Sequence, residues 1–407
     1  MRHIIPSFIA LLLLVSAASA EGAEFRITPS FALSEEYTDN IFLESRDEQE
    51  EYITSLRPSI TLFYEDAPWR WDVAYLMDYL IYARNTRGDE LLHDLAANGH
   101  ITVVRDFFFV DVHDRFERVS LDPARDFTRE SLFLNQSDRN LFRINPYFVL
   151  EPGRLTTLTV GYRFSDTWYE EETAIDRTDN SAYSELALEV SPRTKAYVRY
   201  EFMDEDNDAV DFQRHDARAG ARYEYTEESF IFGEAGNTWL DFDDGRSLNK
   251  PVWRAGLSRA FAYVTVTVET GREYEENPEG SVLKVDRYEA SLESPLGRAT
   301  LRLAARLGEY SIAETDALET RTYGGGLDVG YELSARAKAH LDASLDKLER
   351  KFSSDDPLIF LGGVRVEYLV LEDVTASLAY RYAQSDTKTG FDEYDNNRAV
   401  LELRAAF

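Results

Sequence analysis

The sequence predicts an all-β fold, a transmembrane antiparallel up-and-down β-barrel of about 20 strands, within a range of about 18 to 22. Three observations predict it. Apolar and polar residues alternate with a period of two along almost the whole chain, whereas helical stripes are nearly absent. The alternating segments are roughly ten to thirteen residues long, which is enough to cross a bilayer when tilted. Short and long connections alternate between them, as is typical of outer-membrane barrels.

The N-terminus predicts a secretory signal peptide over residues 1–20. Arg2 is basic, an apolar core covers residues 9–15, and small residues at 18–20 precede the expected cleavage site. A membrane anchor is the weaker alternative, because the apolar run is shorter than the ~20 residues of a spanning helix. Residues 21–407 then form a single outer-membrane barrel domain, since no Pro- or Ser-rich linker divides them.

Composition narrows the classes of function. The 407 residues include no Cys, which excludes a disulfide scaffold and any Cys-ligated metal. The formal charge of −31 argues against nucleic acid as a partner, because nucleic acid selects basic surfaces. The chain also contains 24 Tyr and 24 Phe, although 29% of its residues are charged. That combination excludes intrinsic disorder and suits a protein that contacts both water and lipid.

The strands can be followed from the first to the last. In residues 24–37 one face carries Phe25, Ile27, Pro29, Phe31 and Leu33. The same alternation returns in the segments 157–165, 196–202, 299–308, 323–333 and 400–407. Because an unpaired backbone group in hydrocarbon costs several kcal/mol, we expect the first strand to pair with the last. The stretch 230–240 changes face midway and predicts a bulge.

The connections and the aromatic residues give the barrel two distinct ends. Short turns are expected at 66–69, 151–154, 191–194, 295–298 and 371–373. Long acidic loops are expected at 38–51, 120–138, 203–211, 241–247 and 274–280. Aromatic residues near strand ends predict interfacial girdles: Trp71, Phe116, Trp168, Tyr225, Trp253, Tyr310 and Tyr382.

The opening of the mature chain resembles a known family. The segment 29–45, with Tyr37, Asp39, Asn40 and Phe42, is similar to the start of outer-membrane β-barrel, porin-like proteins. Members are often found with exopolysaccharide and protein-sorting gene clusters, so the resemblance implies a role at the cell envelope. The C-terminus also looks like the signal read by the barrel assembly machinery, carried by Leu401, Leu403, Ala405 and Phe407.

The faces opposite the apolar ones carry a dense ladder of charges, which predicts a lumenal lining. Its members are Arg163, Arg199, Arg218, Arg222, Arg302, Arg306, Arg365, Arg381, Glu201, Glu289, Asp328 and Glu332. Buried unpaired charge is expensive, so this density indicates water inside the barrel. The ladder would select solutes by charge and size. The alternative is that its ion pairs only hold neighbouring strands together.

Catalytic and metal sites are only weakly indicated. His113, with nearby Asp111 and Arg115, is the closest approach to a hydrolase constellation. The acidic run from Asp204 resembles a calcium loop in its early spacing, but Ala209 replaces the glycine that such a loop needs. We therefore predict no enzyme activity, no cofactor and no specific metal site, with diffuse binding of divalent cations near lipopolysaccharide as an alternative.

These observations lead to one leading function and one alternative. The leading function is a water-filled outer-membrane pore for small hydrophilic solutes, with a link to exopolysaccharide export or envelope biogenesis that the resemblance implies. The alternative is a non-conducting barrel scaffold that docks or sheaths a periplasmic or secretion partner. Expected partners are outer-membrane lipid, lipopolysaccharide, the barrel assembly machinery, and hydrophilic solutes or polysaccharide. The oligomeric state is left open.

Overall fold

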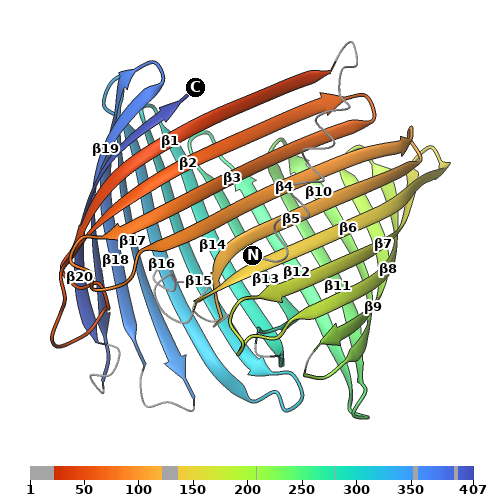
Figure 1. The fold of residues 1–407 in the computed structure, drawn as a ribbon. Coiled ribbons are helices and arrows are strands. Elements are labelled where there is room, and N and C mark those ends of the chain that lie inside the picture. The colour runs from red at the N-terminus through yellow and green to blue at the C-terminus, as the bar shows by residue number, and fades with distance from the viewer. Residues whose placement is uncertain (1–22, 122–135, 208, 279, 352–355, 389–392) are drawn as a thin grey trace.

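A computed structural model describes residues 23–121, 136–207, 209–278, 280–351, 356–388 and 393–407, and these form a closed antiparallel barrel of 20 strands (Figure 1). Every element in these residues is a strand, which confirms the predicted all-β barrel and its strand number. No helix in the described part of the chain is long and apolar enough to cross a membrane. The predicted signal peptide, residues 1–20, lies outside the described residues.

The strands follow one another around the barrel in chain order. They are β1 (Glu24–Thr38), β2 (Glu51–Asp66), β3 (Trp69–Tyr82), β4 (Glu90–Val104), β5 (Phe108–Ser120), β6 (Gln136–Gly153), β7 (Thr156–Tyr169), β8 (Arg177–Ser191), β9 (Thr194–Asn207), β10 (Phe212–Thr226), β11 (Ser229–Phe242), β12 (Ser247–Ala260), β13 (Thr265–Glu276), β14 (Val282–Leu296), β15 (Ala299–Ile312), β16 (Leu318–Glu332), β17 (Ala337–Arg350), β18 (Leu358–Leu371), β19 (Val374–Asp386) and β20 (Tyr394–Ala406).

Short turns and longer connections alternate as predicted, but several acidic segments expected to be loops are strand ends. The strands contain 12 to 18 residues, more than the ten to thirteen expected. Met203–Asn207 continues β9, and Tyr274–Glu276 continues β13, so the connections there shrink to 208–211 and 277–281. Polar residues prolong these strands because they go on pairing across the sheet: the Gln213 amide donates to Asp204 Oδ1 at 3.1 Å.

The first and last strands close the sheet, as expected. β1 pairs with β20 from Ser30 opposite Ala406 to Thr38 opposite Arg398. The backbone N–H of Phe407 continues this edge by donating to the carbonyl of Pro29 at 2.9 Å. Figure 1 shows the C-terminus at this seam, beside β1 and β19. The closed sheet leaves no free edge at the junction between the two ends of the chain.

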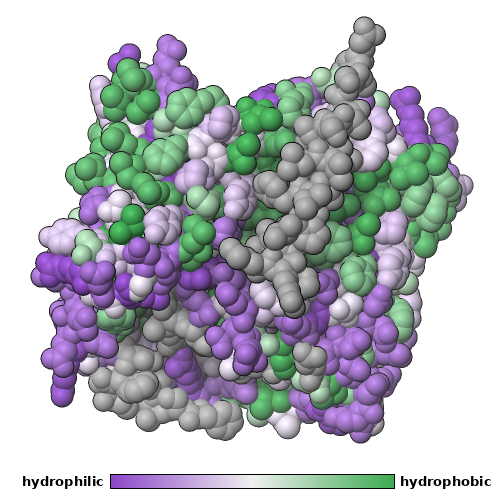
Figure 2. All heavy atoms as spheres, in the orientation of Figure 1, coloured by the Kyte–Doolittle hydropathy of each residue, from purple (hydrophilic) through white to green (hydrophobic). Residues whose placement is uncertain are grey.

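Strand register assigns each side chain to the outward or the lumenal face, because residues directly opposite each other share a face. Phe31 and Leu33 are exposed on the outside of β1, and Ala405 and Leu403 of β20 lie opposite them. Apolar positions begin at the short-turn end and stop at polar residues such as Glu35. Figure 2 shows this division on one face, with hydrophobic residues gathered in the upper part and hydrophilic residues towards the lower end.

Tyrosine hydroxyls mark the limit of the outward apolar band on the side away from the short turns. Tyr75 shares a hydrogen bond of 2.7 Å with His93 Nδ1, and Tyr200 shares one of the same length with His215 Nδ1. Each pair joins neighbouring strands on the outward face. A phenol ring has an apolar body and a polar tip, so it fits the boundary between hydrocarbon and water.

The predicted aromatic girdle is correct at most positions and wrong at one. Trp71, Phe116, Trp168, Trp253 and Tyr382 occupy outward register positions. Tyr225 lies at a register shift in β10, where its hydroxyl donates to the carbonyl of Ser258 at 3.0 Å. Tyr310 instead lies on the lumenal face, opposite Val285, and is 2% exposed. It shares the parity of Arg306 on β15, and the alternation of that strand is unbroken.

The bulge expected within residues 230–240 is absent. β11 pairs with β10 in continuous register from Phe230 to Phe242, and the register shift falls at the turn, between Glu224 and Thr226. The apparent change of face arises because Phe230, Phe232 and Leu240 point into the lumen. The Arg222 guanidinium lies 3.5 Å from the centre of the Phe230 ring, so this lumenal ring makes a cation–π contact with the arginine.

Candidate functional site

The twelve ladder residues all occupy lumenal register positions, but they do not form one site. They are spread over β7, β9, β10, β14, β15, β16, β18 and β19. Many are ion-paired within the wall: Arg163 and Arg199 both bind Glu201, at 2.9 and 2.7 Å. Arg302 lies 3.3 Å from Glu293. Cross-strand and same-strand ion pairing therefore occurs within the ladder, and a water lining of these residues stays a prediction.

The structure adds a feature that the sequence reasoning missed, an inner hairpin. We use this name for residues 272–286, which are the ends of β13 and β14 away from the short turns together with their connection. β12 pairs with β13 only from Ala260 opposite Thr265 to Trp253 opposite Arg272. Beyond that point β12 has no partner in β13, whereas β13 and β14 stay paired as far as Glu276 opposite Val282. At this point β13 separates from β12, whereas β14 stays paired with β15 as far as Leu283 opposite Ile312, so the hairpin remains part of the sheet on its β14 side.

The tip of the inner hairpin reaches connections that belong to strands several positions away. The N–H of Ile175, between β7 and β8, donates to the carbonyl of Pro278 at 2.8 Å. A Cβ atom placed on Gly280 would lie 3.0 Å from the Cβ of Ala209, between β9 and β10. These contacts cross β11 and β12, so the tip of the inner hairpin lies over the lumenal side of these two strands.

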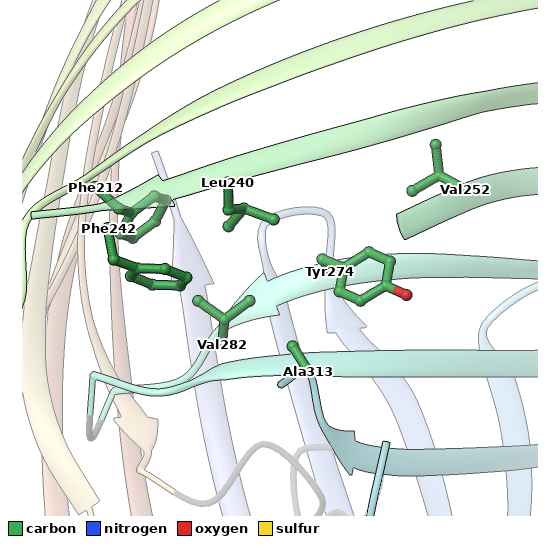
Figure 3. Packing of buried hydrophobic residues seen from close by; sticks show 7 residues of the cluster. All are labelled: Phe212, Leu240, Phe242, Val252, Tyr274, Val282 and Ala313. Carbon is green, nitrogen blue, oxygen red and sulfur yellow. The ribbon is translucent and has the colours of Figure 1, made fainter. Parts of the chain in front are cut away.

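An apolar cluster holds the inner hairpin against the inside of the wall. Tyr274 and Val282 of the hairpin pack with lumenal side chains of β10, β11 and β12, and all point toward one another (Figure 3). The wall contributes Phe212, Leu240, Phe242 and Val252, and Ala313 completes the cluster. Leu240 and Ala313 have no exposed surface. Removing this apolar area from water stabilises the docked position.

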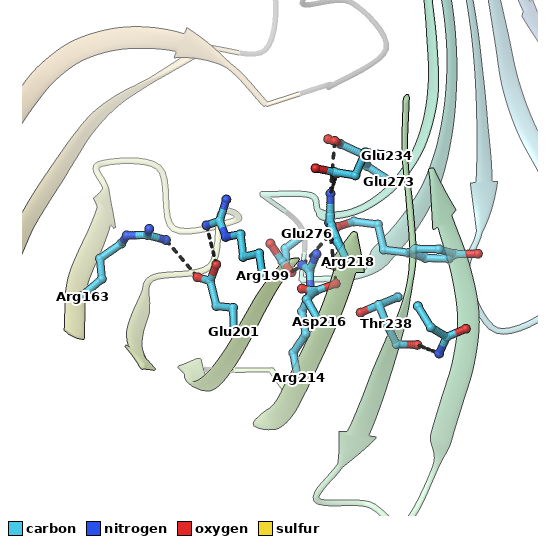
Figure 4. A network of polar contacts seen from close by, with 12 residues as sticks. Arg163, Arg199, Glu201, Arg214, Asp216, Arg218, Glu234, Thr238, Glu273 and Glu276 are labelled. Atoms are coloured by element: carbon cyan, nitrogen blue, oxygen red, sulfur yellow. Dashed lines mark hydrogen bonds and ion pairs between the residues drawn. The ribbon is translucent and has the colours of Figure 1, made fainter. Parts of the chain in front are cut away.

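Ion pairs hold the same interface. Arg214 of β10 binds Glu276 of the hairpin at 3.2 Å, donates to the carbonyl of Tyr274 at 3.1 Å, and binds Asp216 at 2.7 Å. Arg218 reaches Glu273 at 3.7 Å from the same strand. Figure 4 shows Glu273 and Glu276 meeting these two arginines. The Arg214 and Glu276 side chains are 13% and 17% exposed, so this pair is largely shielded from water.

The inner hairpin explains charges at positions that should be apolar. Towards the short-turn ends of β13 and β14 the even-numbered residues face outward, as the exposed Val268 and Tyr288 show. Further from the short turns the same face carries Arg272, which lies opposite Trp253 and binds Asp286 at 2.7 Å, and then Tyr274, which packs on lumenal side chains of the wall. Charged residues at outward positions, where hydrocarbon would exclude them, are the sequence signal that could have predicted the hairpin.

The connection between β15 and β16 binds the inner hairpin through one carboxylate. Asp316 accepts hydrogen bonds from Lys250 Nζ at 2.7 Å and from Lys284 Nζ at 2.9 Å. Lys250 lies on β12 and Lys284 on the inner hairpin, so one carboxylate bridges the gap between them. These two lysines lower the pKa of Asp316 from its usual value, because they stabilise its ionised form.

Another part of the lumen keeps a polar cavity. It has a volume of about 640 Å³ and lies along β14 to β19. Charged and titratable side chains in its lining are Arg302, Asp328, His340, Asp342, Arg365 and Arg381. Four of these are ladder residues, so the cavity is the place where the structure brings the largest part of the predicted lining together.

The weak hydrolase constellation does not assemble. Asp111 hydrogen-bonds His100 across β4 and β5 at 2.7 Å. His113 hydrogen-bonds Asn98 at 2.8 Å instead of meeting Asp111. Among the described residues no group of three or more His, Asp or Glu side chains is placed to hold a metal ion. The acidic residues Asp204 and Asp206 belong to β9, where they alternate with lumenal residues.

Comparison with known proteins supports the fold. No protein-family model matches the chain, and no curated protein matches it. A mutant of the ferric enterobactin receptor from Pseudomonas aeruginosa aligns with a TM-score of 0.54 at 9% identity, covering 94% of this chain and 80% of that chain. The FrpB iron transporter from Neisseria meningitidis aligns with a TM-score of 0.50 at 9% identity, over 93% and 82%.

These likenesses bear on the fold alone, since sequence identity is so low. They support the barrel fold that the resemblance implied. They give no support to its link with exopolysaccharide gene clusters.

Proposed function

We propose that this chain is an outer-membrane channel for small hydrophilic solutes, narrowed by the inner hairpin. In this proposal the short-turn end faces the periplasm and the longer connections face the outside. The outward apolar band contacts lipid, and the connections above it contact lipopolysaccharide. A more specific version of this proposal is that the channel takes part in polysaccharide export, as the resemblance implies.

One observation carries the proposal, the contrast between the two faces of a single closed wall. Outward positions bear large exposed apolar side chains such as Phe31 and Leu403. Lumenal positions bear charges such as Arg57, which binds Asp78 at 2.9 Å and Glu402 at 3.0 Å. Charges inside a barrel require water, and a barrel of about 20 strands is wide enough to contain it.

The inner hairpin supports a narrowed channel more than a wide one. Its apolar cluster and ion pairs place two strands against β8 to β12, inside the wall. The cavity along β14 to β19 lies on other strands. We therefore expect solutes to pass along the part of the wall that the hairpin leaves uncovered.

Planar-bilayer recording of the purified protein tests the proposal. We expect ohmic steps, and Arg302→Glu should shift the permeability ratio towards cations, because the Arg302 side chain is 60% exposed. Arg306→Glu is a poorer probe, since Arg306 binds Asp346, whose side chain is only 4% exposed. Arg105→Glu, in a short turn and 91% exposed, is the matched control that should leave the ratio unchanged.

Absence of conductance from a correctly folded barrel would overturn the proposal. It would favour the non-conducting scaffold that docks a periplasmic or secretion partner. Heat-modifiable gel migration shows whether the purified barrel is folded, so a silent recording can be told apart from a misfolded sample.

A further inference from the structure

One row of directly opposed lumenal residues crosses β15 to β20 and sorts its charges by sign. Its members in order are Arg302, Asp328, Asp342, Gly363, Arg381 and Arg398. Two acids are neighbours on β16 and β17, two arginines are neighbours on β19 and β20, and a glycine separates the pairs. Like charges directly opposite each other are destabilising. A ligand that carries both signs of charge could place its cationic group beside the acidic pair and its anionic group beside the arginine pair.

The arginine pair has one guanidinium to offer. Arg398 is engaged by Glu36 at 2.6 Å. Arg381 is exposed to the lumen and makes no hydrogen bond, ion pair or ring contact with any residue in the described ranges. Its planar fork of N–H donors matches a carboxylate or phosphate and can bind it through two parallel hydrogen bonds.

The glycine between the two pairs makes room for a ligand. A Cβ atom on Gly363 would lie 3.0 Å from Oδ1 of Asp342, so any other residue there would press on that carboxylate. Gly330 opens the next lumenal row in the same way, beside His340. Both glycines line the cavity of about 640 Å³, which is large enough for a small organic molecule.

We propose that this cavity binds a zwitterionic solute, with its anionic group at Arg381 and its cationic group at Asp328 and Asp342. β17 and β19 are two strand spacings apart, about 9.6 Å, so a molecule between an amino acid and a dipeptide in length spans the gap. The inference rests on the proposed channel function, because it makes this site part of the solute path. It deepens that function by giving the chemical class of the solute.

Isothermal titration calorimetry on the folded barrel in detergent tests the site without needing conductance. The probes are glycylglycine, which carries both charges, N-acetylglycylglycine, which carries only the anion, and glycylglycinamide, which carries only the cation. We expect glycylglycine to bind at least tenfold more tightly than either singly charged probe. Arg381→Gln and Asp342→Asn should each remove that preference, while Arg70→Gln, a lumenal arginine outside the cavity, should retain it.

Equal affinity for glycylglycine and N-acetylglycylglycine would overturn the zwitterion proposal and leave an anion subsite. Lack of binding by all three probes to a folded barrel would overturn the site altogether. Neither result depends on the bilayer recordings. A conducting barrel that binds no zwitterion would therefore show that this inference fails while the channel proposal holds. A silent barrel that binds glycylglycine would separate them in the opposite direction.

Discussion

Single residues decide how the ends of this chain and its inner hairpin are fastened. Asp316 links Lys250 of the wall to Lys284 of the hairpin, and Phe407 finishes the closing strand beside β1. Asp316 and Phe407 both lie outside the strands, so their effects can be separated from the packing of the strands.

The Asp316 bridge should make a small, pH-dependent contribution to stability. The lysines lower the pKa of this carboxyl in the folded state. Its contribution is therefore present above the usual value of 3.8 and is lost as the pH falls through the lowered pKa. Asp316→Asn should destabilise the barrel by at most about 1 kcal/mol at neutral pH, because the bridge is half exposed.

Thermal unfolding followed by gel migration checks this, at neutral pH and at a pH well below the lowered pKa. The difference between wild type and variant should disappear at the lower pH. A difference of equal size at both values would show that the Asp316 bridge does not act through its charge.

Phe407 should matter for assembly more than for the finished barrel. Its side chain is 76% exposed on the outward face, so it adds little packing. Deleting it should lower the amount of heat-modifiable barrel in the outer membrane several-fold, with unitary conductance unchanged. Phe407→Tyr keeps the aromatic ring and should assemble normally. If the deletion assembled as well as wild type, the C-terminal residues would not be the assembly signal.

At the scale of elements, the β13–β14 hairpin is the unit that departs from the regular barrel. β14 stays paired with β15 along its length, but beyond Arg272 β13 separates from β12, and Tyr274 and Glu276 of its outward face meet lumenal side chains of the wall. Tyr274 packs against lumenal side chains of β10 to β12, and Glu276 binds Arg214 of β10. Arg272 is held by Asp286 of β14, and Lys284 by Asp316 in the connection after β15.

Removing Glu276 should loosen the inner hairpin. Glu276→Ala takes one carboxylate from Arg214, which is largely shielded from water, and the loss of such a partner costs about 3 kcal/mol. We expect faster hydrogen exchange at backbone amides 273–285, measured by mass spectrometry. Glu224→Ala is the matched control, since Glu224 faces Arg222 at 3.6 Å and both are largely exposed. Unchanged exchange in Glu276→Ala would show that the ion pairs do not hold the hairpin.

The position of the hairpin tip can be tested by crosslinking, because the chain has no Cys of its own. In the double variant Ala209→Cys with Gly280→Cys, oxidation should form a disulfide after a small adjustment, since the two Cβ positions are 3.0 Å apart. The control pairs Ala209→Cys with Gly297→Cys, another glycine with positive φ, in the turn before β15. Crosslinking of both pairs, or of neither, would contradict the docked position.

At the scale of the whole molecule, the sequence determined more of the wall than of its contents. Period-two alternation and connection lengths were enough for the strand number, the closure of β1 on β20 and the lumenal set of charges. They work because every strand repeats the same outward and inward environment. Tyr310 and the residues 230–240 were misread, since a large barrel contains lumenal aromatic residues that a simple two-sided pattern assigns to lipid.

The inner hairpin could not be predicted from alternation. β13 and β14 stay in continuous register with each other, although the residues that their outward face contacts change along the strands. The partners of Arg214 and Arg218 on β13 are distant in sequence, and only the three-dimensional path of the chain brings them together. The cavity along β14 to β19 is similar. Its ladder residues were foreseen one by one, but their sorting into an acidic and a basic pair depends on register.

In the proposed channel the inner hairpin narrows a polar, water-filled barrel. The most direct measurement is the unitary conductance of a variant in which residues 274–284 are replaced by an Asn-Gly turn joining Glu273 to Val285, which face each other in register. We expect a folded, heat-modifiable barrel whose conductance is clearly larger than that of the wild type. A folded variant with the same conductance as the wild type would contradict it.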